Sequence, residues 1–386
     1  MKREPLLLNE PRIQAMMEKN KVDLLILRSN ANSQYISEFF HNGGNLGYRP
    51  FVVFYFRDPA LKPALVVPAV DLHLAMYMTW IEDVRAYQMA ELFTDLNVNF
   101  YADFFDAARS IMSDRNAKGM VIGTEGEDLS TGFRNKLEQD LLADHKIVDV
   151  SYEMELVRMV KTPEENRRLK EAAEITVKAH ASFRETIKPG NTDRDLFTAA
   201  VKRMYDEGAD GVRFINVGCG PVSFAAHCPY PLDYTLKEGD FVKVDMGAEV
   251  KGYPADFVRS YYIGDATQRA KDIWKWLNDA QMETAYWLKP GVTGGEIFDY
   301  SYKQISKHLE NYPREFFGHG LGIGSHEQPR MNKVNKTILE PNTPICLETS
   351  YYYEGVRFHS EETFLVKENG IDHWTADCPR DLIITT

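Results

Sequence analysis

Four carboxylates and one imidazole in the C-terminal part of this chain have the chemistry that divalent metal ions need. These residues are Asp245, Asp256, His319, Glu348 and Glu361. Divalent Mn, Fe, Co and Zn accept carboxylate oxygens and imidazole nitrogens, and four carboxylates can neutralise two such ions and still bridge them. A single ion would not need so many acidic ligands. The set therefore predicts a two-metal hydrolytic site.

Each of the four carboxylates lies in a segment rich in β-branched or aromatic residues, which is typical of a short strand. In chain order, the segments are GDFVKVDMGAEV with Asp245, GYPADFVRSYYIG with Asp256, TPICLETSYYY with Glu348 and EETFLV with Glu361. We therefore expect a sheet to hold the site. Glu362 follows Glu361 directly, and because side chains alternate along a strand, only one of these two can point inward.

The string GHGLGIGSHEQP, residues 318–329, carries two histidines that are seven positions apart. The glycines around them let the backbone bend closely around a buried centre. We expect His319 to bind metal and His326 to face the substrate. A lone histidine is more often an ordinary polar residue, so this interpretation depends on the carboxylates that accompany it.

Four strings of the C-terminal half resemble the successive signatures of the pita-bread metallopeptidases, which include methionine aminopeptidase, aminopeptidase P and prolidase. The strings are DMGAEVKGYPADFVRS, GHGLGIGSHEQP, LETSYY and EETFLVKENG. The ligands of that family follow the order Asp, Asp, His, Glu, Glu, and its two aspartates are eleven positions apart, as Asp245 and Asp256 are. The resemblance implies that Asp256 and Glu361 bridge two ions, that Asp245 chelates one, and that His319 and Glu348 hold the other.

The same resemblance assigns the catalytic steps. A water or hydroxide between the ions is the nucleophile, because two ions lower the pKa of that water, and Glu348 transfers the proton. A further family histidine lies upstream of the first aspartate, where GCGPVSFAAHCPYPLDYTL places His227. His227 and His326 are then expected to bind and polarise the substrate around the tetrahedral intermediate. The family pattern of Glu, an acidic or polar residue and Thr favours Glu361 over Glu362 as the ligand.

Two positions depart from the pattern of prolidases and aminopeptidase P. Those proteins usually have Arg two positions before the last glutamate and Pro after the preceding one, whereas this chain has His359 and Thr349. Arg357 could replace the missing Arg, since an arginine near a metal site orients a carboxylate or stabilises developing negative charge. We therefore take Arg357 and His359 as candidate substrate-binding residues. For the neighbouring Tyr351–Tyr353 the pattern favours ordinary strand packing.

Three functions follow, in order of preference. The first is a dinuclear metal-dependent hydrolase that cleaves the amide bond of short peptides, either an Xaa-Pro dipeptidase of the prolidase kind or an Xaa-Pro aminopeptidase. The second keeps the fold but acts on a small non-peptide metabolite, by creatinase-like C–N hydrolysis or lyase chemistry. The third is a non-catalytic interaction protein, which the intact ligand set disfavours. Mn is the first expectation for the two ions, and the ligands also suit Zn, Co or Fe.

Composition is consistent with a metabolic enzyme that binds a peptide or small molecule. The 386 residues are 44% hydrophobic, enough for roughly two domains with substantial cores. The formal charge of −12 and the lack of basic stripes argue against nucleic-acid binding. The four cysteines have no CxxC spacing, and the three N-terminal leucines form too short an apolar patch for a signal peptide or a membrane span. We expect a cytoplasmic protein.

The first part of the chain alternates helix-like and strand-like segments, which predicts a smaller α/β domain over residues 1–155. The segments are RIQAMMEKNK, VDLLIL, PFVVFYF, ALVVP, GMVIGTE and STGFRNKLEQDL. The helix-then-strand opening and SNANSQYISEFF resemble the creatinase and prolidase type of N-terminal domain. Relatives often use this domain in a dimer to cover the partner's site, so we expect a homodimer. The glycine-rich HNGGNLGYRP, residues 41–50, is either a loop that reaches a neighbouring site or a set of turns.

Residues 156–386 are predicted to form the catalytic α+β domain with the pita-bread fold. Its first helix has Thr162 as N-cap, Pro163 in the first turn and Glu165 completing a capping box, and it runs to about Ile187. A second helix follows in DRDLFTAAVKRMYDEG, and two more begin at about Gln268 and Gly295. The order helix, helix, strands therefore occurs twice, which fits a pseudo-twofold layout with the ions between the two halves.

Overall fold

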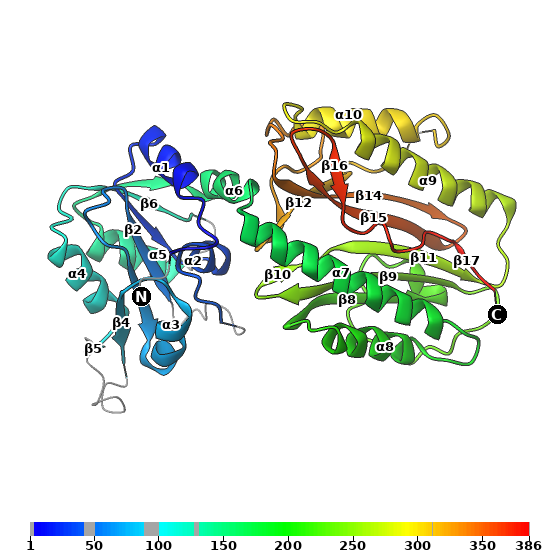
Figure 1. Cartoon of the computed structure of the whole chain (residues 1–386), viewed down its shortest axis with the longest axis horizontal. Coiled ribbons are helices and arrows are strands. Elements are labelled where there is room, and N and C mark those ends of the chain that lie inside the picture. Colours follow the sequence, from blue (N-terminus) through cyan, green and yellow to red (C-terminus); the bar gives the residue numbers. More distant parts are fainter. Residues whose placement is uncertain (1–3, 42–50, 89–99, 127–130, 311, 386) are drawn as a thin grey trace. The chain divides into compact units, whose positions relative to one another are not determined.

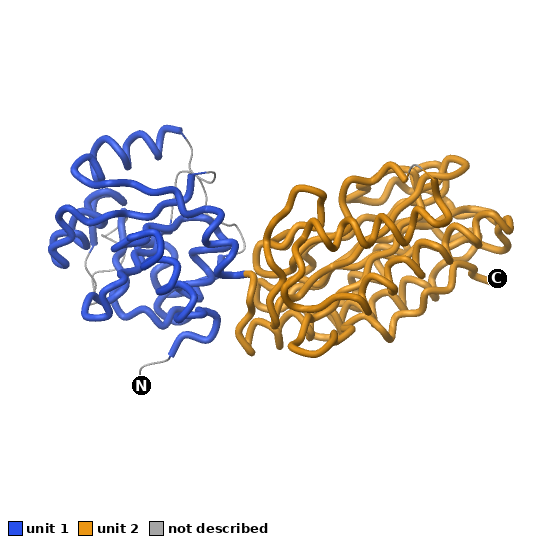
Figure 2. The backbone as a smooth tube through the Cα atoms, turned by 90° about the horizontal axis from the view of Figure 1, so that it is seen from above, with its two compact units in different colours: residues 1–158 blue, residues 159–386 orange. Residues whose placement is uncertain are grey.

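The computed structural model describes residues 4–41, 51–88, 100–126, 131–310 and 312–385. Contacts divide the chain into two compact units, Met1–Arg158 and Met159–Thr386 (Figure 2). Apart from His41, the glycine-rich segment 41–50 lies outside the described residues. Within the described ranges, none of the helices combines the length and apolar character that crossing a membrane requires.

The first unit is an α/β unit built on one seven-stranded sheet, with strand order β5-β4-β3-β2-β1-β6-β7. Its strands are β1 (Leu24–Leu27), β2 (Val52–Phe56), β3 (Ala64–Pro68), β4 (Asp83–Tyr87), β5 (Phe100–Tyr101), β6 (Val121–Thr124) and β7 (Lys146–Asp149). Its helices are α1 (Glu10–Lys19), α2 (Asn30–Ser37), α3 (Leu72–Met78), α4 (Phe104–Asp114), α5 (Thr131–Lys136) and α6 (Ser151–Met159). β2 pairs antiparallel with both β1 and β3, and the other pairs are parallel. The central strands are buried because apolar runs such as LLIL in β1 face the core on both sides.

The second unit contains two five-stranded sheets and four long helices. The helices are α7 (Pro163–Thr186), α8 (Asp193–Asp206), α9 (Gln268–Trp287) and α10 (Gly294–Ile305). The first sheet consists of β8 (Gly211–Cys219), β9 (Phe241–Val250), β10 (Tyr253–Pro254), β11 (Phe257–Ile263) and β17 (Ile383–Ile384). The second consists of β12 (Gly318–Gly322), β13 (Ser325–Glu327), β14 (Thr343–Tyr353), β15 (Val356–Val366) and β16 (Ile371–His373). α7 and α8 lie against the first sheet, and α9 and α10 lie on the second (Figure 1), so the predicted order of two helices and strands does occur twice.

Local sequence fixes where these helices begin. α7 begins at Pro163 with the predicted capping box, in which the Thr162 hydroxyl accepts from the amide of Glu165 and the Glu165 carboxylate accepts from the amide of Thr162. α8 and α10 have equivalent boxes at Thr192 and Thr293. Each box satisfies two amide donors that would otherwise lack partners, which stabilises the first turn.

Strand alternation in β14 and β15 separates a core face from a polar face. Ile345 and Leu347 join Phe358 and Phe364 in the hydrophobic core that contains the buried side of α9. The amide of Gln281, on α9, donates to the Leu347 carbonyl at 2.5 Å and thereby ties the helix to this sheet. Successive side chains point to opposite faces of a strand, so the intervening residues of β14 and β15 point away from α9. This polar face carries the candidate site.

Candidate metal centre

The predicted metal ligands come from the two sheets of the second unit. Asp245 lies on β9, and Asp256 directly precedes β11, where Val258 pairs with Asp245. His319, Glu348 and Glu361 lie on β12, β14 and β15 of the second sheet. Glu348 and Glu361 are direct cross-strand partners, so their carboxylates lie on the same face. The structure therefore forms the cluster where the two sheets of this unit meet.

One cavity of about 560 Å³ collects all nine residues that the sequence singled out. They are Asp245, Asp256, His319, Glu348, Glu361, His227, His326, Arg357 and His359. The volume lies within the range of roughly 300–1,000 Å³ that small-molecule sites occupy. A larger cavity of about 720 Å³ in the first unit is lined by the partly exposed pair Arg57 and Asp23 and has no comparable cluster among its lining residues. The chemistry therefore favours the smaller cavity.

His319 lies at the centre of the buried cluster. Its Nε2 is 3.6 Å from Asp256 Oδ2 and 3.5 Å from Glu361 Oε1. Its Nδ1 donates to the Gly320 carbonyl at 3.0 Å, which fixes the ring orientation. Burial lowers the pKa of His319, so the imidazole is neutral. A neutral imidazole with Nε2 free of its proton is the form that binds a metal ion.

The pKa values of three of the four carboxylates are raised above their ordinary values. Burial, with the nearby Glu348 charge, raises the pKa of Asp245 to about 7. Burial and Glu361 raise the pKa of Asp256 well above its ordinary value, and burial and Glu348 do the same to the pKa of Glu361. A buried set of acids behaves in this way when no cation neutralises it.

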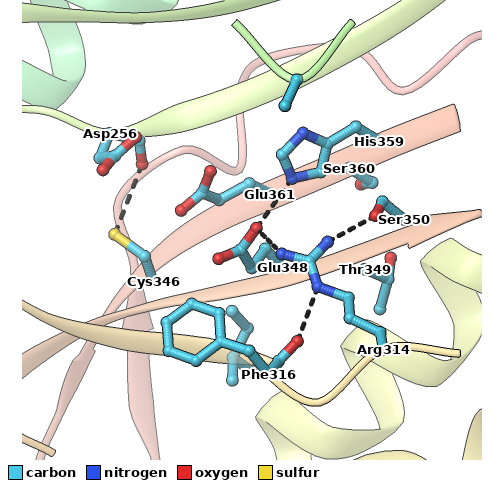
Figure 3. Close-up of polar contacts among 12 residues, drawn as sticks. Asp256, Arg314, Phe316, Cys346, Glu348, Thr349, Ser350, His359, Ser360 and Glu361 are labelled. Carbon is cyan, nitrogen blue, oxygen red and sulfur yellow. Dashed lines mark hydrogen bonds and ion pairs between the residues drawn. The ribbon is translucent and has the colours of Figure 1, made fainter. Parts of the chain in front are cut away.

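Glu348 differs because two cationic or donor groups hold it. Arg314 Nη2 forms an ion pair with Glu348 Oε2, and His359 Nε2 donates to the same oxygen at 2.9 Å (Figure 3). Burial opposes ionisation, but Arg314 and His359 hold the pKa of Glu348 well below its usual range. Glu348 is therefore an ionised acceptor. Arg314 is fixed in turn by the Ser350 hydroxyl at 2.6 Å and the Phe316 carbonyl at 2.7 Å.

These residues fit divalent ions on two further observations. Oδ1 of Asp245 and Oε1 of Glu361 are buried and accept no hydrogen bond in the described structure. A buried carboxylate oxygen without a partner is costly unless a cation or a donor reaches it. Asp256, His319 and Glu361 each offer a ligand atom within 4.8 Å of the others. The donors are oxygens and one imidazole nitrogen, as first-row divalent ions require.

Strand alternation separates Glu361 from Glu362 as the sequence required. Glu361 points to the cavity, whereas Glu362 is fully buried on the other face. There Arg259 Nη2 lies 2.8 Å and Arg380 Nε 2.6 Å from Glu362 Oε1. Burial by itself would raise the pKa of Glu362, but these cations, Arg259 most of all, lower it to about 2. Glu362 is therefore a charge-balanced structural anion.

The four candidate substrate-binding residues line the same cavity as the cluster but differ in exposure and in their contacts. His227 is exposed, and the side chain of His326 is 64% exposed with its Nε2 4.0 Å from Asp256 Oδ2. His359 is buried against Glu348. The guanidinium of Arg357 lies 5.8 Å from the Tyr352 ring centroid and has no carboxylate partner among the described residues.

Sequence reasoning missed two residues of this site. Arg314 lies five positions before His319 in YPREFFGHG, and nothing in that string indicated a partner for Glu348. Cys346 is two positions before Glu348, so strand alternation alone places it on the same face. All four cysteines are free and buried. The thiol of Cys346, however, joins Asp256, His319 and Glu361 within 4.8 Å.

The glycines beside His319 leave no room for a side chain, which gives a testable prediction. A Cβ on Gly320 would lie 2.0 Å from the Gln328 carbonyl oxygen. We expect Gly320→Ala to lower the free energy of unfolding by at least about 1–3 kcal/mol, the usual cost of overpacking. It should also reduce bound metal, because His319 is displaced.

Thermal unfolding and elemental analysis of the purified variant provide the measurement. Gly211→Ala is the matched control, since its Cβ would meet nothing closer than Glu249 at 3.7 Å. If the Gly320→Ala protein were as stable as the control and bound as much metal, the close approach of Gly320 to the Gln328 carbonyl would be contradicted.

Comparison with known proteins identifies relatives of both units. Residues 167–368 match the family described as Metallopeptidase family M24, and residues 11–160 match the Creatinase/Prolidase N-terminal domain. An Xaa-Pro dipeptidase from Pyrococcus horikoshii is 26% identical over 360 residues, which are 92% of this chain and 93% of that protein. An X-Pro aminopeptidase structure from Thermotoga maritima has a TM-score of 0.80 at 25% identity, over 97% of this chain and 99% of that one. A prolidase structure from Pyrococcus horikoshii has a TM-score of 0.80 at 23% identity, over 97% and 99% of the two chains, and shares the fold.

Proposed function

Because the chain belongs to metallopeptidase family M24 and has its two-domain pita-bread fold, we propose that it hydrolyses short peptides with proline after the scissile bond. The reaction is that of an Xaa-Pro dipeptidase or an Xaa-Pro aminopeptidase, the activities named for two relatives. The observation that carries this proposal is the cluster of four carboxylates and one imidazole, all buried except the half-buried Asp245, that lines a cavity of about 560 Å³.

Five residues would hold two divalent ions in this proposal. They are Asp245, Asp256, His319, Glu348 and Glu361. Asp256 and Glu361, whose carboxylates approach the same nitrogen of His319, would bridge the ions. When bound, such ions lower the pKa of a water molecule and polarise the scissile carbonyl.

The side chains around the cluster then move protons and orient the substrate. Glu348, kept ionised by Arg314 and His359, accepts the proton of the attacking water and passes it to the leaving amine. His227 and His326 reach the open side of the cavity and donate to the oxygen that becomes negative in the tetrahedral intermediate. Both lie at the solvent side, where a peptide enters.

Arg357 gives the cavity a cationic group for the substrate's own carboxylate. Its Nε is buried without a hydrogen bond, and no carboxylate of the described chain pairs with it. A guanidinium binds a carboxylate with two parallel hydrogen bonds. A free C-terminal carboxylate next to the scissile bond occurs in a dipeptide, so Arg357 favours dipeptidase over aminopeptidase activity. His359 would contribute through its contact with Glu348.

A second candidate function is hydrolysis or lyase chemistry on a small non-peptide metabolite. One observation favours it: Glu348 is held by Arg314 and His359, whereas prolidases and aminopeptidase P usually have Arg at the position of His359. A different shape at this end of the cavity would admit a different substrate. A non-catalytic role is set aside because the chain is a member of a metallopeptidase family.

Substrate length and metal dependence test the proposal together. Metal-stripped protein supplied with Mn²⁺, Co²⁺ or Zn²⁺ is assayed on Xaa-Pro dipeptides and on longer peptides with proline in the second position. We expect metal-dependent cleavage, with dipeptides preferred because of Arg357. Cleavage of the longer peptides alone would identify an aminopeptidase. A protein that binds two ions but cleaves neither would support the metabolite reaction.

Two wider expectations stay predictions from the sequence. The homodimer is tested by sedimentation velocity of the full chain, where a monomer at micromolar concentration would contradict it. The cytoplasmic location is tested by fractionation of the source cells. The peptide, rather than nucleic acid or membrane, is the expected partner.

A further inference from the structure

We propose that Cys346 is a ligand to one of the two ions, and that it makes this position selective for a thiophilic divalent cation such as Zn²⁺ or Cd²⁺. The inference rests on the proposed metal centre and specifies it further. Neither the family signatures nor the sequence pattern assigns this residue a role. Its place in the fold does, because the strand register puts the thiol among the other ligands.

The register of three neighbouring strands aligns Cys346 with the cluster. Cys346 on β14 is the cross-strand partner of His319 on β12 and of Thr363 on β15. Directly paired residues present their side chains on the same face of a sheet. Glu348, two positions further along β14, is on this face as well. The sulfur therefore belongs to the same polar face as the imidazole and the carboxylates.

The ligand atoms of this cluster are close enough for one ion to reach all of them. His319 Nε2 is 3.6 Å from Asp256 Oδ2 and 3.5 Å from Glu361 Oε1. Ligands about 2.1 Å from one tetrahedral ion are separated from each other by roughly 3.4 Å. Cys346 Sγ lies within 4.8 Å of the other three ligand atoms. The sulfur is thus placed beside these two oxygens and this nitrogen, as a further ligand to the ion that His319 and Glu348 would hold.

The present contacts of the thiol are weak, and a neighbouring oxygen lacks a partner. Sγ lies 3.5 Å from the Asp256 carbonyl oxygen (Figure 3) and 3.6 Å from Thr363 Oγ1. Oε1 of Glu361, a residue that is only 3% exposed, accepts no hydrogen bond in the described structure. A cation between these atoms would satisfy Glu361 and replace the weak sulfur contacts with a strong bond.

Coordination exchanges the S–H bond for a sulfur–metal bond without oxidation or reduction. The released proton leaves to solvent by way of the cavity that Glu361 lines. A thiolate is a soft ligand, so it favours Zn²⁺, Cd²⁺ and Co²⁺ over Mn²⁺, which prefers oxygen. The position without sulfur, next to Asp245, keeps the ordinary carboxylate preference. The two ions of this site are therefore predicted to differ.

Cobalt titration of the metal-stripped full chain tests the assignment without a substrate. Bound Co²⁺ gives visible d–d bands with any ligand set and a near-ultraviolet charge-transfer band only with a thiolate. We expect both bands in the native protein, and loss of the charge-transfer band alone in Cys346→Ser. The same variant should raise the Kd for Cd²⁺ by at least about tenfold, the lower end of the effect of removing a supporting ligand, and change that for Mn²⁺ little. Cys378→Ser is the matched control, a buried free cysteine elsewhere.

The outcomes separate this inference from the function it rests on. Cobalt d–d bands without a charge-transfer band, or a charge-transfer band that survives Cys346→Ser, would overturn the role of Cys346 and leave the metal centre standing. Absence of cobalt binding would overturn both. If Cys346→Ser does not fold, X-ray absorption of the native zinc protein decides, because one sulfur at about 2.3 Å from zinc is expected.

Discussion

Asp256→Ala is expected to lose both metal ions together and to lower kcat/KM by at least about 10³-fold, as the loss of several kcal/mol of transition-state stabilisation would. Asp256 is buried, and its carboxylate approaches His319 at 3.6 Å on the side that Glu361 also faces. In the proposed centre Asp256 would hold both ions, and it would then contribute to the affinity for each. Its removal therefore empties the site rather than half of it.

Elemental analysis after gel filtration and steady-state kinetics on the best Xaa-Pro substrate provide the measurement. Asp265→Ala is a suitable control, since this carboxylate follows β11 but its side chain is 83% exposed, and it contacts Lys271 and the Ala266 amide rather than the cluster. The control should keep two ions and its activity. One ion retained by Asp256→Ala would show that Asp256 does not bridge, and two would remove it from the ligand set.

The second large effect concerns stability without metal. Between pH 6.5 and pH 8 we expect the metal-stripped protein to lose stability as pH rises, by on the order of 2–4 kcal/mol or about 5 °C in Tm. The cause is the buried carboxylates: the folded-state pKa of Asp245 is about 7, and those of Asp256 and Glu361 are well above their ordinary values.

The sign follows from the direction of these shifts. A carboxyl whose folded pKa is raised binds a proton that the unfolded chain has already released, so its contribution is complete below pH 4 and is lost as pH rises through the folded pKa. Histidines with lowered pKa, such as His319 and His359, act in the opposite direction, but only below about pH 6.5. Lys243, with a pKa of about 8, contributes above that value. Between these values the carboxyls with a raised folded pKa dominate. They are the three acids of the cluster and, outside it, Glu165, whose pKa burial raises to about 7.

Differential scanning calorimetry at the two pH values, with chelator and with saturating Mn²⁺ or Zn²⁺, measures this effect. Bound ions displace the protons of the cluster, so the metal-loaded protein should show a shallower profile, in which Glu165 still titrates. Glu361→Gln removes one of the acids and should reduce the slope of the metal-free protein. Equal Tm values at both pH values without metal would mean that the acids are not held in the cluster as the structure shows.

The sequence was informative where a residue's role depends on its own segment. The capping box at Thr162 and the helices near Gln268 and Gly295 were predicted within a residue, because caps and periodicity are local. The alternation of side chains along a strand also predicted that only one of Glu361 and Glu362 could face the site. The domain boundary between residues 155 and 156 and the roles of the site residues stay predictions.

Contacts between distant segments could not be predicted. The sequence did not say which strands pair with one another: Asp245 and Glu361 belong to strands of different sheets. Arg314 meets Glu348 across 34 positions of chain, and Arg259 meets Glu362 across more than a hundred. No local pattern encodes such pairs, because any buried carboxylate needs a cation but the sequence does not say which one.

The sequence by itself determined the family, the fold class and the five residues whose order and spacing name a metal-dependent hydrolase. Ligand type, strand alternation and helix caps each depend on residues that are close together in the sequence. Only the tertiary structure decided which charged and polar groups contact one another in the cavity. It tied Glu348 to Arg314 and His359, left Arg357 without an acid among the described residues, and brought Cys346 to the ligands. Burial and electrostatic pairing depend on packing across the whole unit, so they arise only once the chain has folded.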